Sequence, residues 1–163
     1  MDRCALLAIM QAAKKADDSL LRDYAETTVA VADIKIAVRS MKTGKNKDFM
    51  KRAMAECNTL DIDRLATAAV AGMEEIGRYL ADTAYAGGAE ALSKSASAFE
   101  RWCDNRIIET IKPQKYNPFT VGPIVAYILA RLNEIKTVRI ILTCKLNRLP
   151  EEAIRERGRG MYV

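Results

Sequence analysis

The sequence predicts an all-α protein, and three observations support that prediction. All four prolines lie between Pro113 and Pro150, so the first two-thirds of the chain contains no residue that must interrupt a helix. Half of the residues are hydrophobic but only 6% are aromatic, so aliphatic side chains must fill the interior, which favours packed helices. No stretch alternates apolar and polar residues between turn signals, as a strand would. We therefore expect a helical bundle of long and short helices.

The first third of the chain contains the most regular pattern. A first helix is predicted from about Asp2 to Lys15, and Asp17 or Asp18 caps a second helix that ends near Thr43. We interpret this second helix as a core helix of a bundle, with a two-chain coiled coil as the alternative. Its apolar seam advances in steps of four and three residues, at Leu20, Tyr24, Thr27, Val31, Ile34, Val38 and Met41.

Breaks made of glycine, proline and polar residues separate the remaining helices. The clearest breaks are the Thr43–Asn46 segment, the Tyr85–Gly88 segment and the proline-rich link over 112–118. Pro150 then starts the last helix at a first-turn position. Between these points we predict helices over about 47–56, from Asp61 onward, over 72–81, over 89–111 and over 119–147. With 163 residues, we expect a single all-helical region over 1–163.

The residues on which most enzymes and metal sites depend are missing. The chain has no histidine, which is the commonest general base and a common metal ligand. It also has no GxxxxGK[ST] or GxGxxG motif to cradle a nucleotide. The four cysteines lie far apart with no CxxC pair, so reduced thiols are expected: Cys4, Cys57, Cys103 and Cys144. We therefore expect no catalytic residue, no metal and no cofactor.

The charge of the chain bears on its partners. The net charge of +5 permits an acidic protein, an anionic membrane surface or nucleic acid as a partner. The cationic run between Lys42 and Arg52 lacks interleaved aromatic residues, so we prefer a solvated face to a phosphate-binding site. The most apolar run, over 121–142, contains four charged residues, so no segment is expected to span a membrane.

The predicted helix over 124–142 carries two arginines within its apolar face. Its stripe consists of Ile124, Ile128, Leu132, Ile135, Val138 and Leu142. On a helical wheel Arg131 and Arg139 fall inside this stripe, and a buried guanidinium needs a carboxylate or carbonyl partner. Glu134 lies well round the helix from Arg139, so we predict that Arg139 pairs with another helix in a structural salt bridge. The alternative is that both arginines face a partner helix.

Two other segments supply candidate residues. In Phe99-Glu100-Arg101-Trp102-Cys103-Asp104-Asn105 we expect Phe99 and Trp102 to pack in the core. Asp104 or Glu109 is then a candidate partner for a buried arginine. Asp33-Ile34-Lys35, near the middle of the second helix, has a faint echo in Thr137-Val138-Arg139, which suggests an internal repeat.

The last stretch, over 116–163, resembles the C-terminal end of the C subunit of the A/V-type rotary ATP synthases, which is the counterpart of the d subunit of the vacuolar ATPase. The similarity is strong from about Phe99 to Arg157 and looser over 2–80. It rests on Gly122-Pro123, Ala126-Tyr127-Ile128-Leu129-Ala130, Asn133-Glu134-Ile135-Lys136, Val138-Arg139-Ile140-Ile141, Lys145-Leu146-Asn147 and Leu149-Pro150-Glu151-Glu152-Ala153-Ile154-Arg155-Glu156-Arg157. The Phe99–Asn105 segment and the helix with Asp33, Lys35 and Arg39 add to it.

This resemblance implies a non-catalytic rotor subunit. Members of the family fold as a helical funnel of pseudo-repeated modules, so this chain looks like the C-terminal half of a longer protein. The resemblance implies that the protein links the central stalk to the membrane proteolipid ring and couples ATP synthesis or hydrolysis to H⁺ or Na⁺ transport. It would lie at the cytoplasmic face of the membrane as a peripheral part of the complex. Half of a funnel could also self-associate through exposed apolar surface.

Several positions depart from the family pattern. Cys144 and Arg148 stand where the family often has glycine, and Gly122 replaces a common acidic residue. Gly158 and Gly160 replace apolar residues of the terminal helix, where each glycine costs about 1 kcal/mol of helix stability. An alternative function from the residues alone is a small basic helical module that binds nucleic acid or regulates a partner. The scattered acidic residues argue against the basic stripe that nucleic-acid binding needs, so we expect no nucleic-acid partner.

Overall fold

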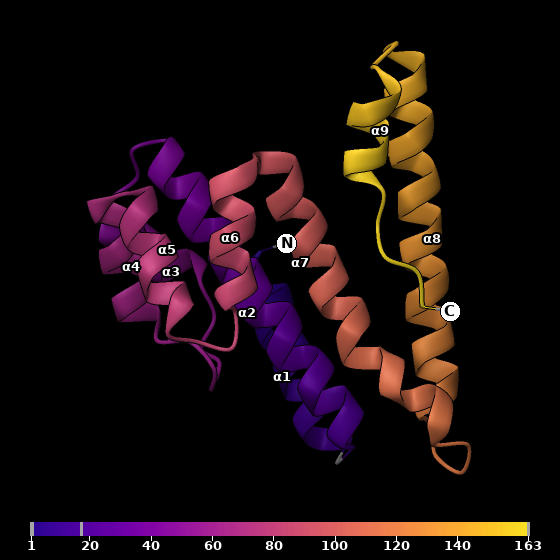
Figure 1. Cartoon of the computed structure of the whole chain (residues 1–163). Helices are drawn as coiled ribbons and strands as arrows, with labels where there is room; N and C mark the ends of the chain where they lie inside the picture. Colours follow the sequence, from indigo (N-terminus) through magenta and orange to yellow (C-terminus); the bar gives the residue numbers. More distant parts are fainter. Residues whose placement is uncertain (1, 17, 163) are drawn as a thin grey trace. The chain divides into compact units, whose positions relative to one another are not determined.

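The computed structural model describes residues 2–16 and 18–162, and all regular elements among these residues are helical (Figure 1). The predicted all-α fold class is therefore confirmed. The elements are α1 (Arg3–Ala16), α2 (Ser19–Lys42), α3 (Lys47–Ala53), α4 (Ile62–Ala71), α5 (Met73–Ala81), α6 (Ala86–Lys94), α7 (Ala96–Ile111), the 3₁₀ helix η1 (Lys112–Tyr116), α8 (Gly122–Leu146) and α9 (Glu151–Arg157). The chain divides into two compact units, residues 1–93 and 94–163.

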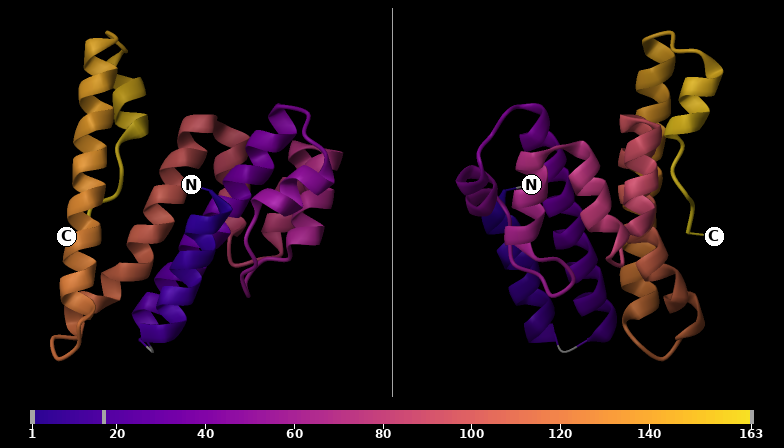
Figure 2. Two further views of the ribbon diagram at one scale, coloured as in Figure 1. Left: turned by 180° about the vertical axis from the view of Figure 1, so that it is seen from behind. Right: turned by 60° about the vertical axis from the view of Figure 1, so that its left-hand side comes forward.

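Helix α2 is the central element of the first unit. It packs on α1 and also contacts α3, α4 and α5 (Figures 1 and 2). Leu20, Thr27, Val31, Ile34 and Val38 of the predicted seam are buried, while Tyr24 and Met41 are half-buried. The interpretation of α2 as a core helix is thus confirmed, because elements of the same chain cover its seam.

Several of these helices begin directly after a polar residue whose side chain caps the first turn. Asp18 accepts a hydrogen bond from the Leu21 amide at 3.0 Å, which fixes the start of α2. Asn46 caps α3 and Asp61 caps α4 in the same way. Gly72 lies between α4 and α5 with φ of 137°, a backbone conformation that residues other than glycine rarely adopt.

The long helix predicted over 89–111 is in fact two helices, and this prediction was wrong. Ser95 has an extended backbone, with φ of −167° and ψ of 161°, and its hydroxyl accepts a hydrogen bond from the Ala98 amide at 2.9 Å. Serine is among the preferred N-cap residues, so it starts a new helix, α7. The predicted break at Tyr85–Gly88 was also wrong, since α6 begins at Ala86 and includes both glycines.

Helices α7, α8 and α9 form the second unit, with η1 at the turn between the first two. Helix α9 runs back along α8, and both views of Figure 2 agree on this arrangement. Small residues of α8 make the close contacts with its neighbours, since Ala126, Ala130 and Cys144 are buried. The outward stripe predicted to be core is instead exposed, with Ile128 at 53% and Leu142 at 55% of their accessible surface.

The end of α8 contains an unusual backbone conformation. Among the described residues, Arg148 alone of the non-glycine residues has a positive φ, at 54°. Its amide bonds the Lys145 carbonyl at 2.9 Å and the Leu149 amide bonds the Cys144 carbonyl at 3.0 Å, as in a helix C-cap that normally uses glycine. The departure from the family pattern at this position therefore has a structural cost.

Replacing Arg148 with glycine should stabilise the second unit by about 1 kcal/mol, because glycine adopts the left-handed conformation without steric strain. Urea unfolding followed by the fluorescence of Trp102, the single tryptophan, would measure this change. Asn147→Gly is the matched control, since Asn147 has φ of −85° and should lose stability. Equal effects of both substitutions would contradict the assignment.

Candidate functional site

A buried ion-pair cluster in the second unit joins α7, α8 and the segment after α9. We call Asp104, Lys136 and Arg159 the Asp104 cluster. Lys136 Nζ donates to Asp104 Oδ1 at 2.6 Å, and Arg159 Nε donates to Asp104 Oδ2 at 2.8 Å. The side chains of Asp104 and Arg159 are only 8% and 7% exposed, so this pair is shielded from water, whereas that of Lys136 is 49% exposed.

Two amide side chains extend this cluster to the backbone of the C-terminal segment. The Gly160 amide donates to Asn105 Oδ1 at 2.6 Å, and Asn133 Nδ2 donates to the Gly160 carbonyl at 2.9 Å. A Cβ atom at Gly160 would lie 3.2 Å from Asn105 Oδ1, closer than most such contacts. Gly160 therefore allows the segment to approach α7 closely, and the chain leaves the helical path after Arg157.

Asp104, one of the two candidate partners for a buried arginine, pairs with Arg159 rather than with Arg131 or Arg139. Both Arg131 and Arg139 are exposed, so the prediction that they are buried was wrong. Arg131 pairs with Glu134 on its own helix, and no described carboxylate forms an ion pair with Arg139. The prediction that Arg139 pairs with another helix was wrong for the same reason.

Arg159 could not be identified from the sequence, because the terminal helix was expected to continue through it. A signal was present in the two glycines on either side, Gly158 and Gly160, which stop the helix at Arg157. The expected aromatic packing is found nearby, since the rings of Phe99 and Trp102 stack with centroids 6.2 Å apart. Phe99 is buried and Trp102 half-buried.

Removing the carboxylate of Asp104 should destabilise the second unit strongly. Asp104→Ala leaves the buried Arg159 guanidinium without its counter-ion, and we expect a loss of about 3 kcal/mol in the free energy of unfolding. Trp102 fluorescence during urea unfolding would report it.

Lys136→Met is the matched control, because Lys136 is half exposed and Arg159 still neutralises Asp104. Its effect should stay below about 1 kcal/mol. A large loss with Lys136→Met and a small one with Asp104→Ala would contradict the assigned roles.

Asp33 in the first unit is a buried carboxyl group on α2. It is fully buried, and its Oδ1 accepts a hydrogen bond from the Ala55 amide at 3.2 Å. Its Oδ2 has no hydrogen-bond partner among the described residues. Burial raises its pKa to about 7 from 3.8, and the hydrogen bond from Ala55 only partly offsets this. Lys35, two residues further on, is half-buried and engaged in an interaction.

The environments of the two echoed segments differ. Ile34 is fully buried, whereas its counterpart in the echo, Val138, is 54% exposed. Asp33 is fully buried, whereas Thr137 is half-buried and its hydroxyl donates to the Asn133 carbonyl at 2.8 Å. Similar spacing in the two helices therefore does not give them similar packing.

Asp33 should make the stability of the first unit depend on pH. Its pKa is higher in the folded than in the unfolded chain, so its contribution to stability is fully present below about pH 4 and is lost as the pH rises to about 7. The Asp33→Asn variant has no carboxyl group to ionise at this position. Its free energy of unfolding should therefore rise relative to that of the wild type by about 4 kcal/mol over this pH range and then level off. Urea unfolding followed by circular dichroism at several pH values measures it.

Asp63→Asn gives the opposite sign and is the control. Asp63 is exposed, and its ion pair with Lys51 at 2.8 Å lowers its pKa. This variant should therefore be slightly less stable than the wild type at neutral pH, with the difference vanishing in acid. A pH-independent difference between Asp33→Asn and the wild type would show that Asp33 is not protonated by burial.

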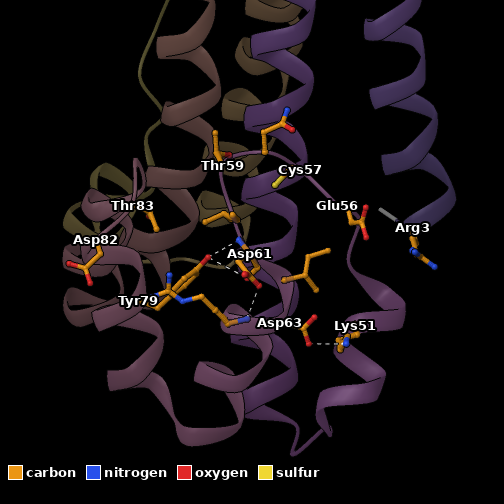
Figure 3. A pocket seen from close by; sticks show the side chains of 14 residues that line it. Arg3, Lys51, Glu56, Cys57, Thr59, Asp61, Asp63, Tyr79, Asp82 and Thr83 are labelled. Atoms are coloured by element: carbon orange, nitrogen blue, oxygen red, sulfur yellow. Dashed lines mark hydrogen bonds and ion pairs between the residues drawn. The ribbon is translucent and has the colours of Figure 1, made fainter.

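A polar cleft of about 710 Å³ lies in the first unit between the loop over 54–61 and the helices α3, α4 and α5 (Figure 3). Its best-defined contacts hold the loop in place. Tyr79 Oη accepts a hydrogen bond from the Asp61 amide at 2.8 Å, and the Arg64 guanidinium lies 5.3 Å from the centre of the Tyr79 ring. These contacts tie the start of α4 to α5.

The cleft offers little for nucleophilic chemistry. Burial, with a contribution from Glu26, raises the pKa of the Cys57 thiol to about 11, so the reactive thiolate is disfavoured at neutral pH. Among the described residues, no three of the types His, Cys, Asp and Glu gather so that they could hold a metal ion. The hydrogen bond from the Asp61 amide to Tyr79 and the contact of Arg64 with the Tyr79 ring hold the loop in place.

A comparison with known protein families identifies the family of this chain. The family described as ATP synthase (C/AC39) subunit matches residues 1–157. Since this match covers nearly the whole chain, the protein belongs to the family of C/AC39 subunits of ATP synthases. No helix among the described residues is long and apolar enough to cross a membrane.

A curated relative is the C subunit of the A-type ATP synthase of Methanocaldococcus jannaschii, 27% identical over 148 residues. The alignment covers 85% of this chain but 37% of the relative, so the chain spans well under half of the relative's length. No solved structure matches the chain.

Proposed function

We propose that this protein is a non-catalytic rotor subunit of an A/V-type rotary ATPase. It links the central stalk to the proteolipid ring and so couples ATP synthesis or hydrolysis to H⁺ or Na⁺ transport. The observation that carries the proposal is the family match over residues 1–157. The chain would act at the cytoplasmic face of the membrane, as a peripheral part of the complex. Within its subunit it would form part of the helical funnel of the family. That residues 1–163 work there as one region stays a prediction.

The distribution of apolar surface supports a role in assembly. Among the described residues, thirteen of the sixteen exposed large hydrophobic residues lie in the second unit, after residue 94. Exposed apolar surface concentrated in this way is typical of a protein that meets other proteins. The chemical groups in the cleft and the Asp104 cluster, by contrast, are engaged in caps and ion pairs that hold the fold together.

The alternative of nucleic-acid binding gains no support from the basic segment over 42–52. Lys47 and Lys51 both direct their ammonium groups at Asp63, at 3.4 and 2.8 Å. This carboxylate offsets the positive charge that phosphate binding would need. The net charge of +5 is compatible with an acidic protein partner.

The experiment is a pull-down of the tagged chain, with the central-stalk subunits and the proteolipid ring of the same source as prey. We expect the chain to retain stalk subunits, ring, or both, and to retain no nucleic acid at physiological salt. The Asp104→Ala variant should retain less if the second unit carries the contact, because that unit is then loosened. Failure to retain either prey, together with salt-steep binding to DNA or RNA, would contradict the proposal and support the alternative.

A further inference from the structure

The outward face of α8 carries an uninterrupted heptad seam. Between Ile128 and Leu146 the residues on this face follow one another in steps of four and three, like the a and d core positions of a coiled coil. They are Ile128, Leu132, Ile135, Arg139, Leu142 and Leu146. Five of the six are large and apolar, and all are exposed, Leu132 at 58% and Leu146 at 83%. We call this surface the α8 seam.

This spacing identifies the kind of element that fits the seam. A repeat of 3.5 residues keeps its side chains facing a neighbour only if that neighbour is another α-helix wound around it at a shallow angle. Helix α8 has 25 residues and is about 37 Å long, at 1.5 Å per residue. An occupant that covers the seam is therefore a helix of several turns rather than a loop or a strand.

Charge on and beside the seam defines the chemistry of that helix. Arg139 occupies a core position, and no carboxylate among the described residues pairs with it. The positions that flank the seam include Arg131, Lys136 and Lys145, which are all exposed. Glu134 lies farther round the helix and is held by Arg131. Lys136 is likewise held by Asp104. The occupant should therefore bring a carboxylate to Arg139 and an acidic residue to the flank beside Lys145.

The same charges argue against a second copy of this chain. In a parallel pair of α8 helices Arg139 would face Arg139, and in either orientation the flanks of both helices would carry the cations Arg131, Lys136 and Lys145. Like charges opposed at the core and flanks of a coiled coil disfavour that pairing. The expectation of self-association through exposed apolar surface is therefore not favoured at this face.

We propose that the α8 seam is a docking site for an α-helix of a separate polypeptide, with an apolar heptad seam that carries an aspartate or glutamate opposite Arg139. The ion pair sets the register, as a single polar core position does in coiled coils. The apolar residues on both sides of Arg139 supply the affinity and exclude water from the pair.

The test uses two synthetic helical peptides of about four heptads with leucine and isoleucine at the core and glutamates at the flanks. They differ at one central core position, which is glutamate in one peptide and lysine in the other. Binding to the full chain is measured by fluorescence anisotropy of the labelled peptides. We expect the wild-type chain to bind the glutamate peptide about ten-fold more tightly than the lysine peptide. Arg139→Glu should reverse this preference.

A matched charge reversal away from the seam is the control. Arg52→Glu makes the same change at an exposed position of α3 and should keep the wild-type preference. If Arg139→Glu keeps the wild-type preference, or if neither peptide binds, the proposal is overturned.

Two further measurements exclude the other occupants. Light scattering of the chain without peptide should give the monomer mass of 18.1 kDa, whereas a dimer dissolved by Leu142→Glu would assign the seam to a second copy and overturn the proposal. Leu146→Ser should leave the thermal midpoint of the monomer nearly unchanged, because Leu146 is 83% exposed. A marked fall of the midpoint would show that the seam is covered within the chain and would overturn the proposal as well.

Discussion

The carboxylate of Asp104 is the constraint on which the second unit depends. It lies on α7, neutralises Arg159 from the C-terminal segment and receives Lys136 from α8, so one side chain joins three elements. Because Asp104 and Arg159 are shielded from water, neither tolerates the loss of the other. The small residues Ala126 and Ala130 then let α8 approach its neighbours closely, which leaves the large apolar residues of α8 on the outside.

Such an arrangement suits a protein whose task is to hold other proteins. The Asp104 cluster and the caps of α2, α3 and α4 use their polar groups to hold helices in place. The surface that is left without cover is a helical seam with one cationic core position. Membership of the C/AC39 family and this use of polar groups within the chain both support the proposed role in assembly.

The sequence predicted the helices well where the local signals were strong, and it failed where long-range packing decided. Asp18, Gly72 and Pro150 marked helix ends correctly, because side-chain caps, positive φ and a proline at a helix start are local effects. The burial of α8 was predicted on the wrong face, since periodicity shows that a stripe exists but not what covers it. Arg159 was missed because its partner lies 55 positions away, and the two flanking glycines were interpreted as weak helix.

Asp104 should keep α8 in place without help from a partner, and hydrogen exchange measured by mass spectrometry on the isolated full chain tests this. We expect the amides of α8 to be protected in the wild type although the outer face of the helix is exposed. In Asp104→Asn, protection should fall in α8 and over 158–162, with α2 unchanged. Rapid exchange throughout α8 in the wild type would contradict the account, because α8 would then need its partner to form.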